Sequence, residues 1–166
     1  MNHHFDIFKV TPQELEKVTA AALSRGGDYC DMYFEYTTFF NLLLKDGVVS
    51  SGGFHTDYGV GIRVLKGEKT GYAYSENTAL PDMLKAADAA SAIAAAGGES
   101  RAYGCVRNQA HDLYPIVQNW RTISAESFLP FLKSLETKVF NSDNRIIKVI
   151  IRLSNSVSDV MMYNSL

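Results

Sequence analysis

Apolar side chains recur at helical spacing in three segments of this chain, and they alternate with polar side chains in much of the sequence between. The first helical segment opens with Thr11-Pro12-Gln13-Glu14, where the threonine can be the N-cap, the proline takes the first helical position and the glutamate completes a capping box. Gly26-Gly27 follows, and a glycine can adopt the left-handed conformation at a helix C-terminus. The pattern predicts a helix that runs to about Arg25.

Alternation with a period of two then predicts a meander of strands. Residues 28–36 fit one half-buried strand, and residues 40–45 form a second run. The second run ends at Asp46-Gly47, a dipeptide typical of hairpins, and residues 48–50 lead back out. Gly52-Gly53 weakens this third strand and indicates a bulge or an exposed bend.

The segment from Tyr58 to Ser75 predicts a tight hairpin with Gly67-Glu68 as its loop, because a glycine in the first loop position suits a type II′ turn. Counting outward from that loop gives the register. One face then pairs branched aliphatic residues with small ones: Val64 with Gly71, Ile62 with Ala73, and Val60 with Ser75. The other face pairs Arg63 with Tyr72 and Gly61 with Tyr74. A helix can approach the first face closely, whereas the second offers an arginine beside tyrosines and a glycine that a tyrosine ring can cover.

A second helix is expected after this hairpin. Asn77-Thr78 can cap it and Pro81 falls in its first turn, while Gly97-Gly98 ends it. Its apolar stripe is mostly alanine, so it must approach its partner closely, and the side of the hairpin with Gly71 and Ala73 permits this. Residues 1–97 are therefore predicted to form an α+β domain, an antiparallel β-meander covered by helices in the order α-β-β-β-β-α.

The remainder of the chain predicts a linker and the start of a second domain. Residues 98–123 have no sustained period and are expected to be a linker or long loop. Residues 124–166 predict a helix, capped by Ser124 or Ser127, and two strands at 145–154 and 157–164. Because the sequence ends in an apolar strand with no polar closure, we expect this α/β-hairpin domain to be truncated and the chain to be a piece of a longer protein.

Charge and composition narrow the classes of partner. The chain has 166 residues, a net charge of −2, and 16 basic side chains scattered among 18 acidic ones. It lacks a basic patch, so direct nucleic-acid binding is not expected. Cys30 and Cys105 match no C-x-x-C pattern, which favours a reduced intracellular protein. No apolar run reaches the ~20 residues of a membrane span, and the start does not resemble a signal peptide, so we infer a cytoplasmic protein without membrane contact.

No catalytic motif is found in the sequence. The four histidines, His3, His4, His55 and His111, form no helical His-Glu-x-x-His pattern, and no serine lies in a Gly-x-Ser-x-Gly elbow. Gly59-Val60-Gly61 could suggest a dinucleotide loop, but these glycines begin a strand, whereas that loop must lead into a helix. The sequence thus predicts no catalytic residue, no metal ligand and no cofactor in this chain.

Arg63 is the residue with the clearest alternative interpretations. In a structural role it stacks on Tyr72 across the hairpin or pairs with an acidic residue, for which Asp31, Glu35 and Asp57 are the candidates. In a functional role it lines a substrate channel or an interface together with Gly61, Tyr72 and Tyr74, because arginine and tyrosine are both enriched at binding hot spots.

The same segments resemble a known family. The matching segments are Gly27-Asp-Tyr-Cys-Asp-Met-Tyr-Phe-Glu35, Tyr58-Gly-Val-Gly-Ile-Arg63, Gly67-Glu-Lys-Thr-Gly-Tyr-Ala-Tyr-Ser75 and the alanine-rich helix. Together they resemble the N-terminal domain of the TldD/PmbA family, whose members are often labelled modulators of DNA gyrase. The match is dense from Gly27 to Ile93 and weaker but collinear from Tyr114 onward. The sequence of the hairpin is closer to the TldD branch than to the PmbA branch.

This resemblance implies a zinc metallopeptidase that acts on unfolded or extended peptides as a homodimer or as a heterodimer with a family paralogue. The family's metal is carried by a His-Glu-x-x-x-His helix and a later cysteine in the C-terminal half, so zinc is implied for the full-length protein and no catalytic residue transfers to this chain. The chain would supply scaffold, channel wall and dimer contacts. A non-catalytic peptide-binding partner subunit of the PmbA type and a free-standing interaction domain stay open as alternatives. The charge pattern gives no support to the DNA association that the gyrase label implies.

Overall fold

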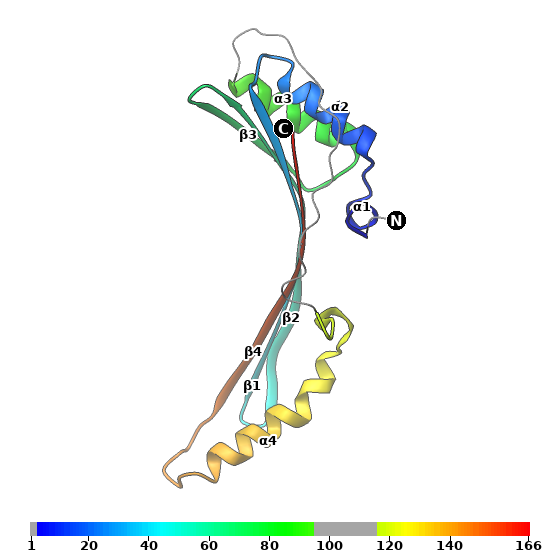
Figure 1. The fold of residues 1–166 in the computed structure, drawn as a ribbon. Helices are drawn as coiled ribbons and strands as arrows, with labels where there is room; N and C mark the ends of the chain where they lie inside the picture. Colours follow the sequence, from blue (N-terminus) through cyan, green and yellow to red (C-terminus); the bar gives the residue numbers. More distant parts are fainter. Residues whose placement is uncertain (1–2, 95–115) are drawn as a thin grey trace. The chain divides into compact units, whose positions relative to one another are not determined.

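The computed structural model describes residues 3–94 and 116–166, and Figure 1 shows their α+β fold. The α-helices are α1 (His3–Phe8), α2 (Pro12–Leu23), α3 (Leu80–Ala94) and α4 (Leu129–Phe140), with short 3-10 turns η1 (Trp120–Thr122) and η2 (Ala125–Phe128). The strands are β1 (Tyr29–Lys45), β2 (Val48–Lys66), β3 (Lys69–Ser75) and β4 (Ile150–Asn164). They form one four-stranded sheet in the order β3-β2-β1-β4.

The sheet is antiparallel, as predicted. Asp46 and Gly47 both have positive φ, 51° and 73°, which is what a type I′ turn between β1 and β2 requires. In the next loop Gly67 has φ of 52°, as expected of a glycine-first type II′ turn. Cys30 bonds to Ser165 and Thr37 bonds to Ser158, so seven steps forward along β1 match seven steps back along β4. β4 therefore also runs antiparallel to its neighbour.

The strands are longer and fewer than the sequence pattern predicted. The runs at 28–36 and 40–45 are one strand, and the expected third strand continues into the hairpin as β2. The expected bulge or bend at Gly52-Gly53 does not end the strand, because β2 runs through both glycines. The two strands expected at 145–154 and 157–164 are likewise a single strand, β4.

The described residues group into two compact units, and β1, β2 and β4 each contribute to both. The first unit holds residues 3–36, 57–94 and 159–166, and the second holds residues 37–56 and 116–158. The expected domain boundary after residue 97 and the linker as far as residue 115 lie outside the described residues. The predicted division into domains at 97 and 123 therefore stays a prediction.

In the first unit, helices cover one face of the sheet (Figure 1). The α2 capping box is present: Glu14 N donates to Thr11 Oγ1 at 3.3 Å, and Thr11 N donates to Glu14 Oε2 at 2.9 Å. α3 lies so close to β3 that a Cβ on Gly71 would sit 2.0 Å from the carbonyl oxygen of Ala90. The close helix approach predicted from the alanine stripe is thus confirmed.

The short helix α1 was not expected, because six residues are too few to show a helical period. It ends in a left-handed residue, Lys9, with φ of 52°. Val10 N bonds back to the carbonyl of Phe5 at 3.2 Å, which is the 6→1 bond of a Schellman cap. The cap turns the chain so that Phe8, fully buried, enters the core beside Phe34.

The second unit is organised by stacked aromatic rings. Phe128 stacks on Trp120 and on Phe40, and Phe40 in turn contacts Phe54, with centroid separations of 5.5, 5.8 and 5.0 Å. α4 has Pro130 in its first turn, but the predicted cap at Ser124 or Ser127 is wrong, because the 3-10 turn η2 follows Ser124 and Phe128 is the residue that precedes α4. Its buried Glu136 accepts a hydrogen bond of 2.9 Å from Gly47 N, so the helix holds the β1–β2 turn.

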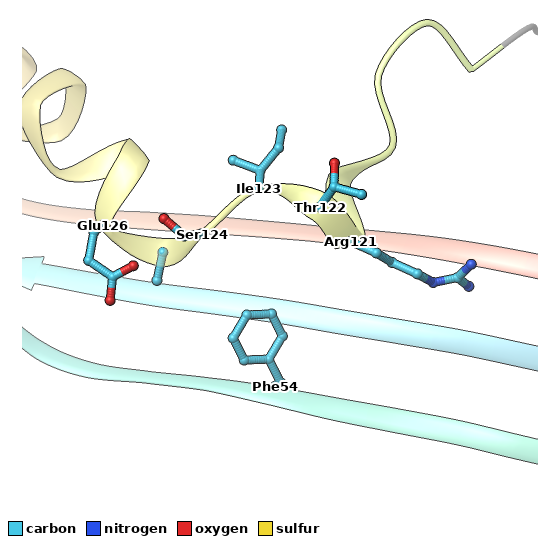
Figure 2. Close-up of a pocket in the computed structure, with 7 residues that line it drawn as sticks. Phe54, Arg121, Thr122, Ile123, Ser124 and Glu126 are labelled. Carbon is cyan, nitrogen blue, oxygen red and sulfur yellow. The ribbon is translucent and has the colours of Figure 1, made fainter.

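A shallow pocket of about 380 Å³ lies on this unit, lined by Phe54 and the segment 121–126 (Figure 2). Arg121 fixes that segment to the sheet, because its Nε donates to Thr38 Oγ1 at 3.0 Å and its Nη2 donates to the carbonyl of Val157 at 2.9 Å. The carboxylate of Glu126 has a lowered pKa, chiefly through a hydrogen bond from its own backbone N–H.

Candidate functional site

The predicted register of the β2–β3 hairpin is confirmed at every pair. The structure pairs Val64 with Gly71, Ile62 with Ala73, Val60 with Ser75, Arg63 with Tyr72, and Gly61 with Tyr74. Gly61, Arg63, Tyr72 and Tyr74 therefore share the face opposite to the helices. We call these four residues, with their β1 neighbour Asp31, the tyrosine face. Tyr72 and Tyr74 are 57% and 70% exposed, so this face is open to solvent.

Gly61 is covered by the ring of Tyr72. A Cβ built on Gly61 would lie 2.6 Å from Tyr72 Oη and 3.0 Å from a ring carbon. The ring therefore leans diagonally across the hairpin toward β2, which matches the expectation that a tyrosine covers this glycine. Tyr74, the residue directly opposite Gly61, stays exposed.

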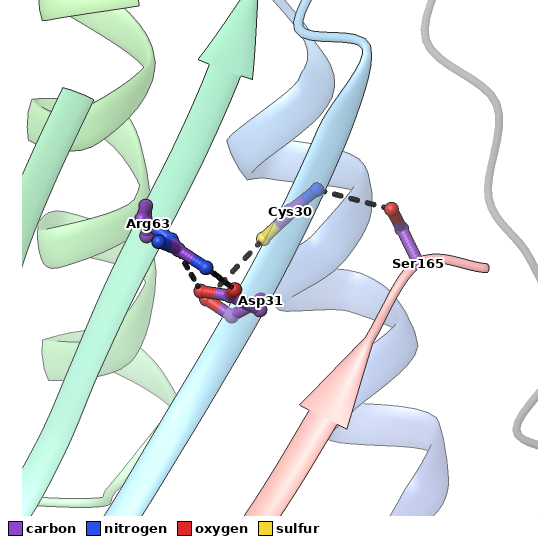
Figure 3. Close-up of polar contacts among 4 residues, drawn as sticks. All are labelled: Cys30, Asp31, Arg63 and Ser165. Atoms are coloured by element: carbon purple, nitrogen blue, oxygen red, sulfur yellow. Dashed lines mark hydrogen bonds and ion pairs between the residues drawn. The ribbon is translucent and has the colours of Figure 1, made fainter. Parts of the chain in front are cut away.

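Arg63 pairs with Asp31 of β1 (Figure 3). Its Nε donates to both carboxylate oxygens at 3.2 Å, and its Nη2 also donates to Oδ2. The hydrogen bonds and the negative charge of Asp31 raise the pKa of Arg63. Of the structural partners that the sequence left open, the fold selects Asp31, whose side chain is only 12% exposed. Arg63 and Asp31 thus form a cross-strand ion pair, in which the carboxylate compensates the charge of the arginine within the sheet.

Cys30 lies beside this ion pair on β1 but points to the opposite, buried face. Burial and the charge of Asp31 raise the pKa of its thiol to about 12. A thiol with such a pKa is not ionised at neutral pH, so Cys30 is a packed core residue without nucleophilic character. Burial, followed by the charge of Asp31, also raises the pKa of Tyr29.

Ser165 makes a contact that the sequence pattern did not indicate. Its backbone N donates to the carbonyl of Cys30 at 2.9 Å, and its Oγ accepts from Cys30 N at 3.0 Å (Figure 3). The pair joins residues 135 positions apart, and a pattern read along the chain carries no signal for so distant a partner. Asp31 differs, since alternation along β1 already placed it on the same face as Arg63.

No metal site is found in the parts of the chain that the structure describes: no three His, Cys, Asp or Glu side chains gather there as ligands would. His111 and Cys105 lie outside these parts. A zinc ion such as the resemblance implies therefore has no fitting donor set among the described residues. Of the helices in residues 3–94 and 116–166, none combines the length and apolar character needed to span a membrane.

These features define a protein with an α+β domain built on an antiparallel sheet, followed by part of a second domain. In the first unit, helices cover one face of the sheet and the tyrosine face is open on the other. Residues 30–94 match the family model described as PmbA/TldA metallopeptidase domain 1. Residues 30–94 therefore match the first domain of this family, and the resemblance carried by the hairpin is confirmed.

Relatives with this domain are considerably longer. A protein of Haemophilus influenzae named "Metalloprotease TldD homolog" is 29% identical over 140 residues, which cover 83% of this chain and 29% of that protein. The TldD name of this relative agrees with the TldD branch that the sequence of the hairpin indicated. This chain thus spans less than a third of the length of that relative.

Solved structures show the same fold at low sequence identity. A proposed modulator of a DNA gyrase from Thermotoga maritima superimposes with a TM-score of 0.69 at 21% identity, covering 93% of this chain and 35% of that one. TldE from Thermococcus kodakarensis gives a TM-score of 0.62 at 11% identity, covering 90% of this chain and 34% of that one. These likenesses show the shared fold alone.

Proposed function

We propose that this chain is the N-terminal part of a TldD-like metallopeptidase that cleaves unfolded or extended peptides. In this role it supplies scaffold, a wall of the substrate channel and dimer contacts. The observation that carries the proposal is the family match over residues 30–94, together with a relative named as a metalloprotease. The cytoplasmic location inferred from the sequence belongs to the same proposal.

The tyrosine face is suited to form the channel wall. Tyrosine offers a rigid, amphipathic ring whose hydroxyl can exchange hydrogen bonds with any peptide backbone. Arg63 is neutralised by Asp31, so this ion pair adds no net charge to the face. A wall with these properties fits a peptidase that accepts many sequences in an extended form.

Zinc would be held by residues that this chain does not contain, on the His-Glu-x-x-x-His helix that the family resemblance implies. Bound there, zinc would activate a water molecule and polarise the scissile carbonyl. The described residues of this chain would position peptide and support the fold, and Gly61, Arg63, Tyr72 and Tyr74 would contact peptide or a partner subunit.

A second candidate is a non-catalytic subunit of the PmbA type that binds peptide for a catalytic paralogue. The exposed tyrosine face favours it as much as the first, because binding needs this face and no metal. A free-standing interaction domain is the third candidate. DNA association gains no support, since the 16 basic side chains are scattered among 18 acidic ones and the net charge is −2.

Metal analysis and peptide turnover of the protein encoded by the complete gene test these candidates. The leading proposal expects about one zinc per chain, loss of turnover with a chelator, and recovery when zinc is returned. Peptide binding without zinc or turnover would establish the non-catalytic subunit instead. Light scattering of the protein with and without its paralogue measures whether it forms a homodimer or a heterodimer.

A further inference from the structure

We propose that the outer edge of β3 binds an extended peptide as an added strand, with the tyrosine face and the flank of α3 on its two sides. The inference rests on the proposed peptide-handling function and names the surface that captures the peptide. It follows from the register of the hairpin, which determines where the free backbone groups lie.

The register assigns each backbone group of β3 to one of the two edges. Lys66 and Lys69 flank a two-residue loop, so they form a hydrogen-bonded pair, and such pairs alternate along the ladder. Gly71 and Ala73 therefore direct their N–H and C=O groups at β2. Thr70, Tyr72 and Tyr74 direct theirs outward. Within the described part of the chain, β2 is the only strand next to β3, so these outward groups can accept an incoming strand.

Side chains on both sides of this edge offer contact surface. On one side lie Tyr72 and Tyr74, and the ring of Tyr72 leans over Gly61, away from the outer edge. On the other side lies α3. Its Asp88 accepts a hydrogen bond of 2.6 Å from Arg25, which follows the C-terminus of α2, so the side of α3 with Asp88 is the side near α2. Ile93 follows Asp88 by five residues, which places it about 140° further round the helix, and it is 60% exposed. In Figure 1 α2 lies on the side of α3 away from β3.

This arrangement matches the needs of a peptide in extended conformation. Three outward residues provide about six backbone hydrogen bonds to an added strand, and these do not depend on the peptide sequence. Successive peptide side chains would alternate between the side of the tyrosines and the side of α3. The tyrosine side favours aromatic or basic residues through ring stacking and cation–π contacts, and the helix side favours aliphatic ones.

A second copy of the chain fits this edge less well. Aligning β3 antiparallel with itself over its whole length places Tyr72 opposite Tyr72 of the copy. The same alignment brings Glu68 and Glu76, which flank β3 in the sequence, opposite one another just beyond both ends of the ladder. Like charges directly opposite one another destabilise a strand pair, whereas a separate peptide carries no such constraint.

Amide hydrogen exchange of this chain, with and without a probe peptide, tests the proposal. The probe is a blocked seven-residue peptide in which valine alternates with arginine. In the free chain we expect fast exchange at Thr70, Tyr72 and Tyr74 and slow exchange at Gly71 and Ala73. Bound peptide should slow the first three amides by about tenfold or more and leave the other two unchanged. Unchanged exchange at the outward amides of saturated chain would overturn the proposal.

Two variants at one position provide a matched control. Thr70→Pro removes an outward N–H and is tolerated at an edge, so it should weaken peptide binding about tenfold. Thr70→Val keeps the N–H and should bind within about twofold of the unaltered chain. Equal affinity of both variants for the probe would contradict strand addition. Protection of the outward amides without peptide, when the chain concentration rises, would show that a second copy occupies the edge and would also overturn the proposal. Because exchange is measured on the unaltered chain, the test does not depend on how well Thr70→Pro folds.

The edge proposal and the proposed function can fail separately. If the complete protein cleaves peptides and Thr70→Pro has no effect on KM, the edge does not capture substrate but the peptidase stands. If the edge amides become protected by the probe while the complete protein has neither zinc nor turnover, the peptide site stands and the peptidase proposal fails.

Discussion

The hydroxyl of Tyr72 occupies the position next to Gly61 where a Cβ would come within 2.6 Å of it. This contact differs in kind from the one at Gly71, where the obstacle is the backbone carbonyl of Ala90 at 2.0 Å. An exposed side chain can rotate away, but the backbone of a packed helix cannot.

The two glycines should therefore respond differently to the same substitution. Gly71→Ala should destabilise the fold by about 1 to 3 kcal/mol, because α3 must move away from the sheet, and Gly71→Val should be at least as severe. Gly61→Ala should change stability by less than about 1 kcal/mol, because Tyr72 can rotate into solvent. Urea unfolding curves of the variants give both values. Equal losses at the two positions would show that α3 does not hold β3 as closely as described.

Loss of Arg63 should destabilise the first unit. Arg63→Ala leaves the carboxylate of Asp31, 12% exposed, without its arginine, and we expect a cost of about 1 to 3 kcal/mol. Asp31→Asn in the same background should recover part of this loss, because the amide carries no charge to leave unpaired. A double-mutant cycle by thermal unfolding measures the coupling. A coupling energy near zero would mean that the ion pair contributes nothing to folding.

Cys30 should make stability fall steeply in alkaline solution. Its folded pKa of about 12 lies above the ordinary value of 9.0, so the folded state keeps the proton that the unfolded state loses. The contribution of Cys30 is complete below pH 9 and is lost as pH rises from about 9 to 12, by up to about 4 kcal/mol. Cys30→Ala is the control, since it removes only this titration. Parallel pH profiles for the two proteins, measured by chemical unfolding, would contradict the burial of the thiol.

Glu136 should act as the anchor of the β1–β2 turn. Glu136→Ala removes the acceptor of the Gly47 N–H and should cost about 1 to 3 kcal/mol, whereas Glu136→Gln keeps an acceptor oxygen and should cost less. Exchange of the Gly47 amide is the direct readout, and it should accelerate in the alanine variant only. Slow exchange of this amide in both variants would assign its protection to another group.

The hairpin was predictable because its register depends on local chemistry. The glycine-first loop determines which residues face one another, so the sharing of one face by Gly61, Arg63, Tyr72 and Tyr74 followed from counting. The capping box that begins at Thr11 depended equally on local sequence. The ends of the strands were harder to predict. β1 continues through Thr37 and Thr38, where the alternation weakens but β-branched side chains still favour an extended backbone.

The partners of the tyrosine face required the tertiary structure. Sequence alternation placed Asp31, Glu35 and Asp57 within reach of Arg63, and only the pairing of β1 with β2 selects Asp31. The position of β4 beside β1 had no local signal at all, since the contacts between them join residues more than a hundred positions apart.

The hydrogen bonds between Ser165 and Cys30 also affect how the chain folds while it is being synthesised, because they join two distant parts of the sequence. β1 is made near the beginning of the chain, yet its outer edge stays unpaired until residues 150–164 have left the ribosome. The outer edge of β1 must therefore stay open while more than a hundred further residues are added. Such a delay makes a chaperone that shields strand edges more useful to this domain than to one whose strands all pair with their neighbours in sequence.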